Sequence, residues 1–311
     1  MSNIFKGILQ FKICKAELNY KKLNPRNWKR PSFKKIIKSL AFFIIFLGAL
    51  IIVRDEYDYQ FGGYYYGDDY DYSEEEYADC NVLGIELRGD LVTYIIPENR
   101  DGNGNSLSDE TASEYIVSAL MEAEANDDIK AIILEIDSYG GLPVASYEIN
   151  QALHQEISKP VVAMVRNAAT SGAYLVAVAA DTIFASPYSD IGGIGITMSY
   201  LDYAKQNNQD GLTYNSLSAG KYKDYGDPNK PLTDEEKTLI MRDLNIIHED
   251  IIRVIATDRN LDINKVRALA DGSSMPGQMA KDNGLIDEIG GITEVESYLK
   301  DKIGEEVVTC W

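Results

Sequence analysis

The sequence predicts an α/β domain with a mostly parallel sheet, preceded by one N-terminal transmembrane helix. From residue 80 onward, short runs rich in Val and Ile alternate with amphipathic segments. That alternation is typical of parallel strands covered by helices on both faces. The first 79 residues lack it and consist of a basic stretch, an apolar run and an acidic stretch in turn. No internal repeat is present, so we expect the domain once in the 311 residues.

The alternation gives the elements in order. Strands are expected at residues 82–87, 131–136, 161–165 and 182–185, and helices at 109–125, 144–157 and 171–179. Thr233 and Glu236 form a capping box that starts a long helix ending near Arg259. A second helix is expected at 262–270, and residues 284–291 close the domain.

The net charge of −19 is unevenly distributed. Residues 1–38 hold eleven Lys and Arg against one acid, Glu17, so the remainder of the chain is strongly acidic. A basic start that an apolar run separates from an acidic remainder is not typical of nucleic-acid binding. We therefore expect no nucleic-acid partner.

An uncharged apolar run of fourteen residues occupies Leu40–Val53. A spanning helix needs roughly 17–25 residues, but a basic side chain such as Lys38 can reach the interface from the end of a span. The charged flanks disfavour a core helix, and the long preceding segment without an A-x-A site disfavours a cleaved signal peptide. We expect a single transmembrane anchor at residues 39–53, with the basic segment 1–38 in the cytoplasm and the acidic bulk outside.

Residues 54–79 contain eight Tyr and ten Asp or Glu, which predicts an extended acidic linker. A folded domain is then expected at 80–298, with a C-terminal tail at 299–311. Cys80 and Cys310 lie near the two ends of this part of the chain, either as a disulfide outside the cell or as two unpaired thiols. With two His and no Cys/His cluster, we expect no metal site, and no cofactor is expected.

The strongest functional signal is Asn-Ala-Ala-Thr-Ser-Gly-Ala-Tyr at residues 167–174. Ser171 follows an apolar strand and precedes an Ala-rich segment, which predicts a strand-to-helix turn. A hydroxyl at such a turn is exposed beside backbone N–H groups and suits a nucleophile that attacks a carbonyl. Taken alone, a serine in this position is more often a helix N-cap.

A serine nucleophile needs a base. His154 and His248 both fall in predicted amphipathic helices, where surface roles explain them better. Lysine is the other known partner of serine, and it works only where desolvation leaves its amine neutral. Lys221 and Lys223 lie 50 and 52 residues beyond Ser171 in a Gly- and Tyr-rich stretch, and spacing alone does not choose between them.

The oxyanion of such a reaction would be held by backbone amides. Gly140 and Gly141 follow a predicted strand, and paired glycines bring N–H groups close to a developing charge, although they also make ordinary turns. The Gly172 N–H, next to the serine, would be a second donor. Gly193 belongs to a third glycine cluster, residues 190–196, which would line the substrate groove and matches no nucleotide-binding motif.

Four segments in order resemble the signal peptide peptidase A family of serine–lysine peptidases, which has the Clp protease/crotonase fold. Residues 137–141 are similar to its D-S-P-G-G turn, 169–174 to A-S-G-G-Y-Y, 192–195 to G-S-I-G, and 220–223 to the base segment, in which the lysine follows an aromatic residue. The resemblance therefore favours Lys223. Residues 280–291 also resemble the family's closing segment, so the likeness covers about residues 80–298.

The chain departs from the family pattern at three positions. Tyr139 replaces a Pro, Ala173 a Gly, and Gly193 a Ser. These changes affect the rigidity of the turn, the space beside the serine and a hydroxyl near the lysine. None removes the nucleophile or the base, so activity is still expected.

The resemblance implies a membrane-anchored serine endopeptidase outside the cytoplasm that cleaves remnant signal peptides. Ser171 would attack the peptide, and Lys223 would take and return the proton. The family assembles as homo-oligomeric rings, so an octamer is expected, with serine and lysine from neighbouring protomers.

Two other functions fit parts of the sequence. A non-catalytic membrane scaffold would keep the fold and bind peptides through the acidic linker. An acyl-CoA enzyme of the crotonase type would want a basic surface for nucleotide phosphates, whereas residues 80–311 carry eighteen Lys and Arg against thirty-eight Asp and Glu.

Overall fold

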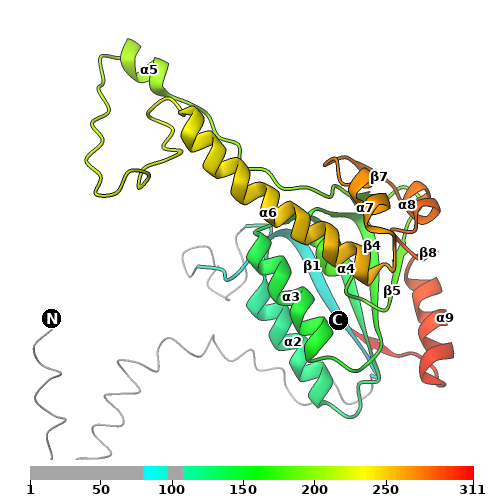
Figure 1. Ribbon diagram of the computed structural model, residues 1–311. Coiled ribbons are helices and arrows are strands. Elements are labelled where there is room, and N and C mark those ends of the chain that lie inside the picture. The colour runs from blue at the N-terminus through cyan, green and yellow to red at the C-terminus, as the bar shows by residue number, and fades with distance from the viewer. Residues whose placement is uncertain (1–79, 97–107) are drawn as a thin grey trace, which may run out of the picture. The chain divides into compact units, whose positions relative to one another are not determined.

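The computed structural model describes residues 80–96 and 108–311 (Figure 1). The basic segment 1–38, the anchor expected at 39–53 and the linker 54–79 lie outside the described residues. Among the helices that the structure does describe, none combines the length and apolar character that a bilayer crossing requires.

The domain is built on a sheet whose main path runs β2-β1-β3-β4-β5-β8, with every neighbouring pair on this path parallel. These strands are β1 (Val82–Val92), β2 (Glu110–Ala112), β3 (Ala131–Gly141), β4 (Val161–Thr170), β5 (Thr182–Ala185) and β8 (Glu288–Ile289). The far end of β4 also pairs with β6 (Asp190–Gly192), which meets β7 (Ser274–Pro276) in antiparallel fashion. The predicted α/β fold with a mostly parallel sheet is confirmed.

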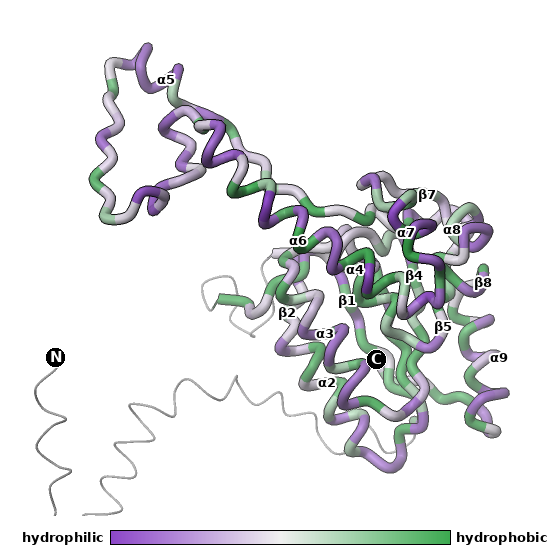
Figure 2. The backbone as a smooth tube through the Cα atoms, viewed as in Figure 1, coloured by the Kyte–Doolittle hydropathy of each residue, from purple (hydrophilic) through white to green (hydrophobic). Residues whose placement is uncertain are grey.

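Helices cover the two faces of the sheet unequally. α2 (Ser113–Ala125), α3 (Pro143–Gln155) and α4 (Gly172–Ala177) pack on one face, and α9 (Ile292–Ile303) packs on the other. The side chains of β3 alternate between them, because Ile132 and Leu134 join the larger cluster and Ile133 joins the smaller one. Figure 2 shows the hydrophobic residues gathered along these strands.

Helix α6 (Asp234–Asp258) begins with the predicted capping box, since Thr233 and Glu236 exchange side chain–backbone hydrogen bonds of 3.0 and 3.2 Å. Ile252 and Ile255, near its C-terminal end, are buried in the main core. Its N-terminal end carries an arm, residues 197–233, which includes α5 (Ala204–Gln209) and lies away from the sheet (Figure 1). After α6 follow α7 (Ile263–Leu269) and α8 (Gly277–Asn283).

Residues 299–311, expected as a tail, belong to the fold instead. α9 continues to Ile303, and β9 (Thr309–Cys310) pairs with the start of β1. A disulfide joins Cys80 to Cys310. The Trp311 ring lies on Gly84, where a Cβ would come within 2.3 Å of it. A strand of two residues has no periodicity to recognise, so only its partner and the disulfide reveal it.

The disulfide should stabilise the domain, because it closes a loop of 230 residues between the first and last strands. We expect Cys80→Ala to lower the free energy of unfolding by about 2–4 kcal/mol, measured by urea denaturation. Dithiothreitol should lower the midpoint of the wild type and leave that of the variant unchanged. Equal midpoints for the oxidised wild type and the variant would contradict this.

Candidate active site

Ser171 lies at a sharp turn between β4 and α4, with φ 53° and ψ −123°. Among the described residues, only Ser171 and Asn260 have a positive φ without being glycine. A side chain in this region of φ/ψ costs on the order of 1–3 kcal/mol, and such strain clusters at functional sites. Ser171 occupies the N-cap position of α4, but its side chain makes no capping hydrogen bond. The capping explanation for this serine is therefore wrong.

The backbone around Ser171 is held from several sides. The Ser171 N–H donates to the Gly192 carbonyl at 2.7 Å, and the Leu175 N–H donates to the Ser171 carbonyl at 3.1 Å. The buried Asn150 amide donates to the Leu175 carbonyl at 2.9 Å. Tyr174 is fully buried and donates to the Leu285 carbonyl at 2.7 Å, and burial raises the pKa of its hydroxyl. The turn is fixed by its surroundings, while no hydrogen bond to a described residue occupies the Ser171 hydroxyl.

The paired glycines at the end of β3 lie directly against this turn. A Cβ on Gly140 would stand 2.8 Å from the Gly172 nitrogen and 3.1 Å from the Ser171 Cβ. A Cβ on Gly172 would stand 3.5 Å from the Gly141 nitrogen. Gly172 is the first residue of α4, so its N–H has no acceptor within the helix. The structure thus brings Ser171, Gly140, Gly141 and Gly172 together.

Two of the predicted glycines have amides that are already engaged. The Gly140 N–H donates to the Ser138 hydroxyl at 3.0 Å, and the Gly193 N–H donates to the Ser273 carbonyl at 3.1 Å. Gly193 nevertheless lies beside the serine, because a Cβ there would be 3.4 Å from the Ser171 nitrogen. Gly141 and Gly172 therefore remain the candidate oxyanion donors, and Gly193 forms part of the wall.

The candidate lysines lie in the arm, and no described hydrogen bond or ion pair joins either to Ser171. The Lys221 amine pairs with Glu235 at 2.6 Å, and this carboxylate raises the pKa of Lys221 above its usual value. Lys223 is exposed and forms no ion pair with any described residue. A lysine held charged by a carboxylate is a poor base, so the contacts favour Lys223 over Lys221.

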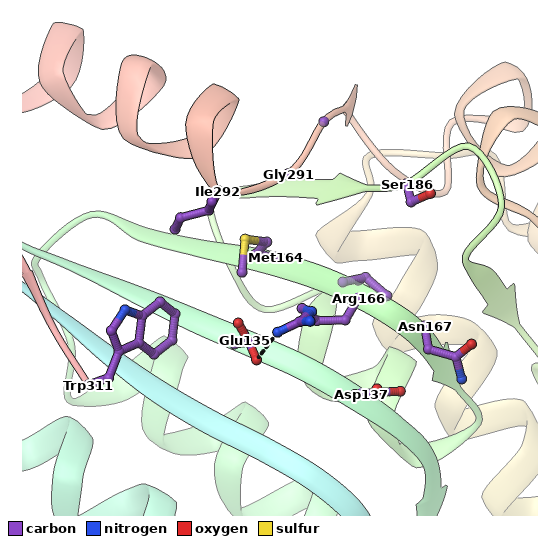
Figure 3. Close-up of a pocket in the computed structure, with 11 residues that line it drawn as sticks. Glu135, Asp137, Met164, Arg166, Asn167, Ser186, Gly291, Ile292 and Trp311 are labelled. Carbon is purple, nitrogen blue, oxygen red and sulfur yellow. Dashed lines mark hydrogen bonds and ion pairs between the residues drawn. The ribbon is translucent and has the colours of Figure 1, made fainter.

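A cavity of about 690 Å³ lies on the sheet face that α9 partly covers (Figure 3). Figure 3 shows Arg166 and Glu135 facing one another on its floor. The Glu135 carboxylate is buried and pairs with Arg88 at 2.8 Å and Arg166 at 3.0 Å. Neither Ser171 nor the glycine donors line this cavity, so it is separate from the candidate active site. Our sequence analysis missed it, although a Glu inside an apolar strand was a signal.

Ser138 and Thr170 were also missed as parts of the site. The Ser138 hydroxyl binds the Gly140 amide, and the Thr170 hydroxyl donates to the Tyr139 carbonyl at 3.1 Å. The Ser138 hydroxyl contacts the glycine turn from within β3, and the Thr170 hydroxyl contacts it from the neighbouring strand β4. The sequence shows that both residues flank the motifs, but not where their hydroxyls point.

Comparisons with known proteins agree with this arrangement. Residues 154–305 match Peptidase family S49, and residues 102–191 match the Clp protease family. A protein of Methanocaldococcus jannaschii named as a protease is 34% identical over 211 residues, covering 68% of this chain and 67% of that protein. A protein of Enterococcus faecium named as a signal peptide peptidase SppA is 31% identical over 202 residues, covering 64% and 59%.

More distant similarities extend to longer proteins and to solved structures. Protease 4 of Haemophilus influenzae is 27% identical over 210 residues, covering 67% of this chain and 34% of that protein. A ClpP1 variant from Listeria monocytogenes is 16% identical with a TM-score of 0.44, covering 68% of this chain and 92% of that one. The matched region spans less than two thirds of the Enterococcus and Haemophilus relatives.

The sheet, the serine turn and the glycine pair define an α/β domain of the Clp protease type. Within that class, the chain belongs to peptidase family S49, the family of the signal peptide peptidases named SppA.

The backbone at Gly140 should tolerate no side chain. Its φ is +104°, and a Cβ would collide with the Gly172 nitrogen. We expect Gly140→Ala to slow the labelling of Ser171 by a fluorophosphonate at least about 100-fold, because the new Cβ would displace the Gly172 donor and the loss of one oxyanion donor has an effect of this size. Gly304→Ala is the control, because φ is +80° there but a Cβ would meet no atom within 4 Å. Equal labelling rates in the two variants would show that the close approach of Gly140 to Gly172 is not needed for the reaction of Ser171.

Proposed function

We propose that the protein is a serine endopeptidase in which Ser171 is the nucleophile and Lys223 is the general base. The observation that carries the proposal is the strained turn at Ser171, with the amides of Gly141 and Gly172 close by. Backbone strain at a strand-to-helix turn is the arrangement by which other hydrolases expose a nucleophilic serine. Membership of peptidase family S49 supports the same chemistry.

The reaction follows from these positions. The neutral Lys223 amine takes the proton of the Ser171 hydroxyl as its oxygen attacks the scissile carbonyl. The negative charge on the tetrahedral intermediate is held by the Gly141 and Gly172 N–H groups. The lysine returns the proton to the leaving amine, and water then hydrolyses the acyl-enzyme.

The base requires a second copy of the chain. Lys223 is exposed on the arm, whereas a lysine that acts as a general base needs surroundings that keep water from its amine. The arm also exposes large apolar side chains, with Leu201 at 71%, Leu212 at 62% and Leu217 at 96%. Exposed apolar groups of this kind mark contact surfaces, so a neighbouring protomer would cover the arm and exclude water from the Lys223 amine. We propose a homo-oligomeric ring, an octamer by family resemblance, with each site shared between protomers.

The proposed substrates are remnant signal peptides, and the proposed location is the outer side of the cell membrane. The apolar run at residues 39–53 supports a single anchor, and the Cys80–Cys310 disulfide supports an oxidising compartment. The similarity to the Enterococcus protein named as a signal peptide peptidase supports the substrate class.

Substitution of the two proposed residues tests the dyad. We expect Ser171→Ala and Lys223→Ala each to lower kcat/KM for an internally quenched apolar peptide by several orders of magnitude, because each removes a member of one catalytic unit. Lys221→Ala is the matched control and should stay within a few-fold of wild type. Near-wild-type turnover by either dyad variant would discard the assignment.

Mixing the two inactive variants extends this test to the shared site. If serine and lysine come from different protomers, rings assembled at random from equal amounts of Ser171→Ala and Lys223→Ala chains should regain about one quarter of wild-type activity. Half of the chains keep Ser171 and half keep Lys223, so about one site in four combines both residues. If both came from one protomer, no mixed ring would contain an intact pair. A mixture without activity would therefore exclude sharing.

The anchor has its own test. We expect the full chain to stay with the membrane fraction after sodium carbonate extraction, and a variant lacking residues 1–53 to be released, because the apolar run is removed. Release of the full chain by carbonate would contradict anchoring.

A further inference from the structure

We propose that Ser138 is a positioning residue, whose hydroxyl decides which amide of the glycine turn faces Ser171. The inference rests on the proposed function, because it concerns the oxyanion donors of that same site. Ser138 does not touch the reacting atoms. It acts through the backbone of Gly140 and Gly141.

The Ser138 hydroxyl is fully committed within the protein. Ser138 is only 1% exposed, so solvent does not compete for its bonds. Its hydroxyl donates to the Gly89 carbonyl at 2.6 Å and accepts the Gly140 N–H at 3.0 Å. A hydroxyl has a single hydrogen to donate, so Ser138 links the β1 backbone to the glycine turn in one fixed orientation.

This link determines the direction of the next amide. The Gly140 N–H points at Ser138 and is therefore not available to an oxyanion. Gly140 has φ +104°, so the backbone turns between the two amides, and holding the Gly140 N–H on Ser138 limits the directions open to the Gly141 N–H. The Gly141 nitrogen is also the one that approaches Gly172, the second candidate donor.

The acceptor that anchors Ser138 is itself rigid. Gly89 has φ +66°, and a Cβ there would lie 2.0 Å from the Asp109 carbonyl oxygen, which accepts the Asp90 N–H at 2.8 Å. On the other side, the Thr170 hydroxyl donates to the Tyr139 carbonyl. The turn is thus held between β1 and the residue that precedes the nucleophile. Loss of the Ser138 bond would free the turn at one end only.

The test compares Ser138 with a matched buried serine. Ser189 is also 1% exposed, and its hydroxyl donates to the Arg166 carbonyl at 2.5 Å and accepts the Ser186 N–H at 3.1 Å. The Ser189 hydroxyl also lies 3.4 Å from the Val165 carbonyl, so Ser189→Ala removes at least as many hydrogen bonds as Ser138→Ala. Ser138→Cys is a third variant, which fills the space but is only a weak hydrogen-bonding partner. The full-length variants are compared by urea midpoint, by kcat and KM on the quenched peptide, and by fluorophosphonate labelling.

We expect Ser138→Ala and Ser138→Cys to lower kcat by about 100-fold with KM within about two-fold, since the loss falls on the transition state. Ser189→Ala should keep kcat within about three-fold, with a urea midpoint as low as that of Ser138→Ala, because the same kind of bonds is lost. Full kcat in Ser138→Cys, or equal kcat in both alanine variants, would overturn the inference.

Failure of the proposed function looks different. Wild-type protein that the fluorophosphonate does not label at Ser171 would refute the serine endopeptidase, and the role of Ser138 with it. Wild-type labelling that Ser138→Ala matches in rate would refute the role of Ser138 alone.

Discussion

The positive φ at Ser171 is the constraint on which the site depends. A serine in this conformation is unfavourable by itself, so its neighbours must hold it there. The Gly192 carbonyl accepts the Ser171 N–H, and the N–H of the buried Leu175 in α4 donates to the Ser171 carbonyl. The cost is recovered from packing, because α4 lies within the main hydrophobic cluster. The fold therefore keeps a half-buried serine, whose hydroxyl has no described hydrogen bond, at the edge of an apolar core.

Glycines allow the other half of the site to approach. Gly140 and Gly172 pack so closely that a Cβ on either would collide with its neighbours, among them the Gly172 nitrogen and the Ser146 hydroxyl. Because these glycines have no side chains, the backbone at the end of β3 can approach the backbone that follows β4 beside Ser171. Hydroxyl groups then direct the amides, because a peptide N–H donates only once. Glycines thus determine how closely the amides approach Ser171, and hydroxyl-bearing residues determine where the amides point.

Sequence periodicity predicted the parts of the fold that bury repeating apolar faces. β3, β4 and α6 were recognisable because each buries a long regular pattern or begins with a capping box. β9 and β8 span two residues each and are stable only through their partners, so no pattern revealed them. The motif at Ser171 was found, but a capping serine has the same pattern, and only the backbone angles separate the two. The engaged amide of Gly140 could not be predicted, because it depends on where one hydroxyl points. Under the proposed function, the environment of Lys223 also depends on a neighbouring protomer, which no pattern within one chain describes.

The bonded ends of the domain have a mechanical consequence. Cys80 lies just before β1 and is joined to Cys310 in β9, which pairs with β1. A pull on the backbone at Cys80 would pass through the disulfide to β9 as well as along the chain to β1. Such a load would be shared by β1 and β9, which pair at the start of β1, and would not pass through the turn at Ser171. Ser171 lies at the opposite ends of the sheet's parallel strands, so it would bear none of that pull directly.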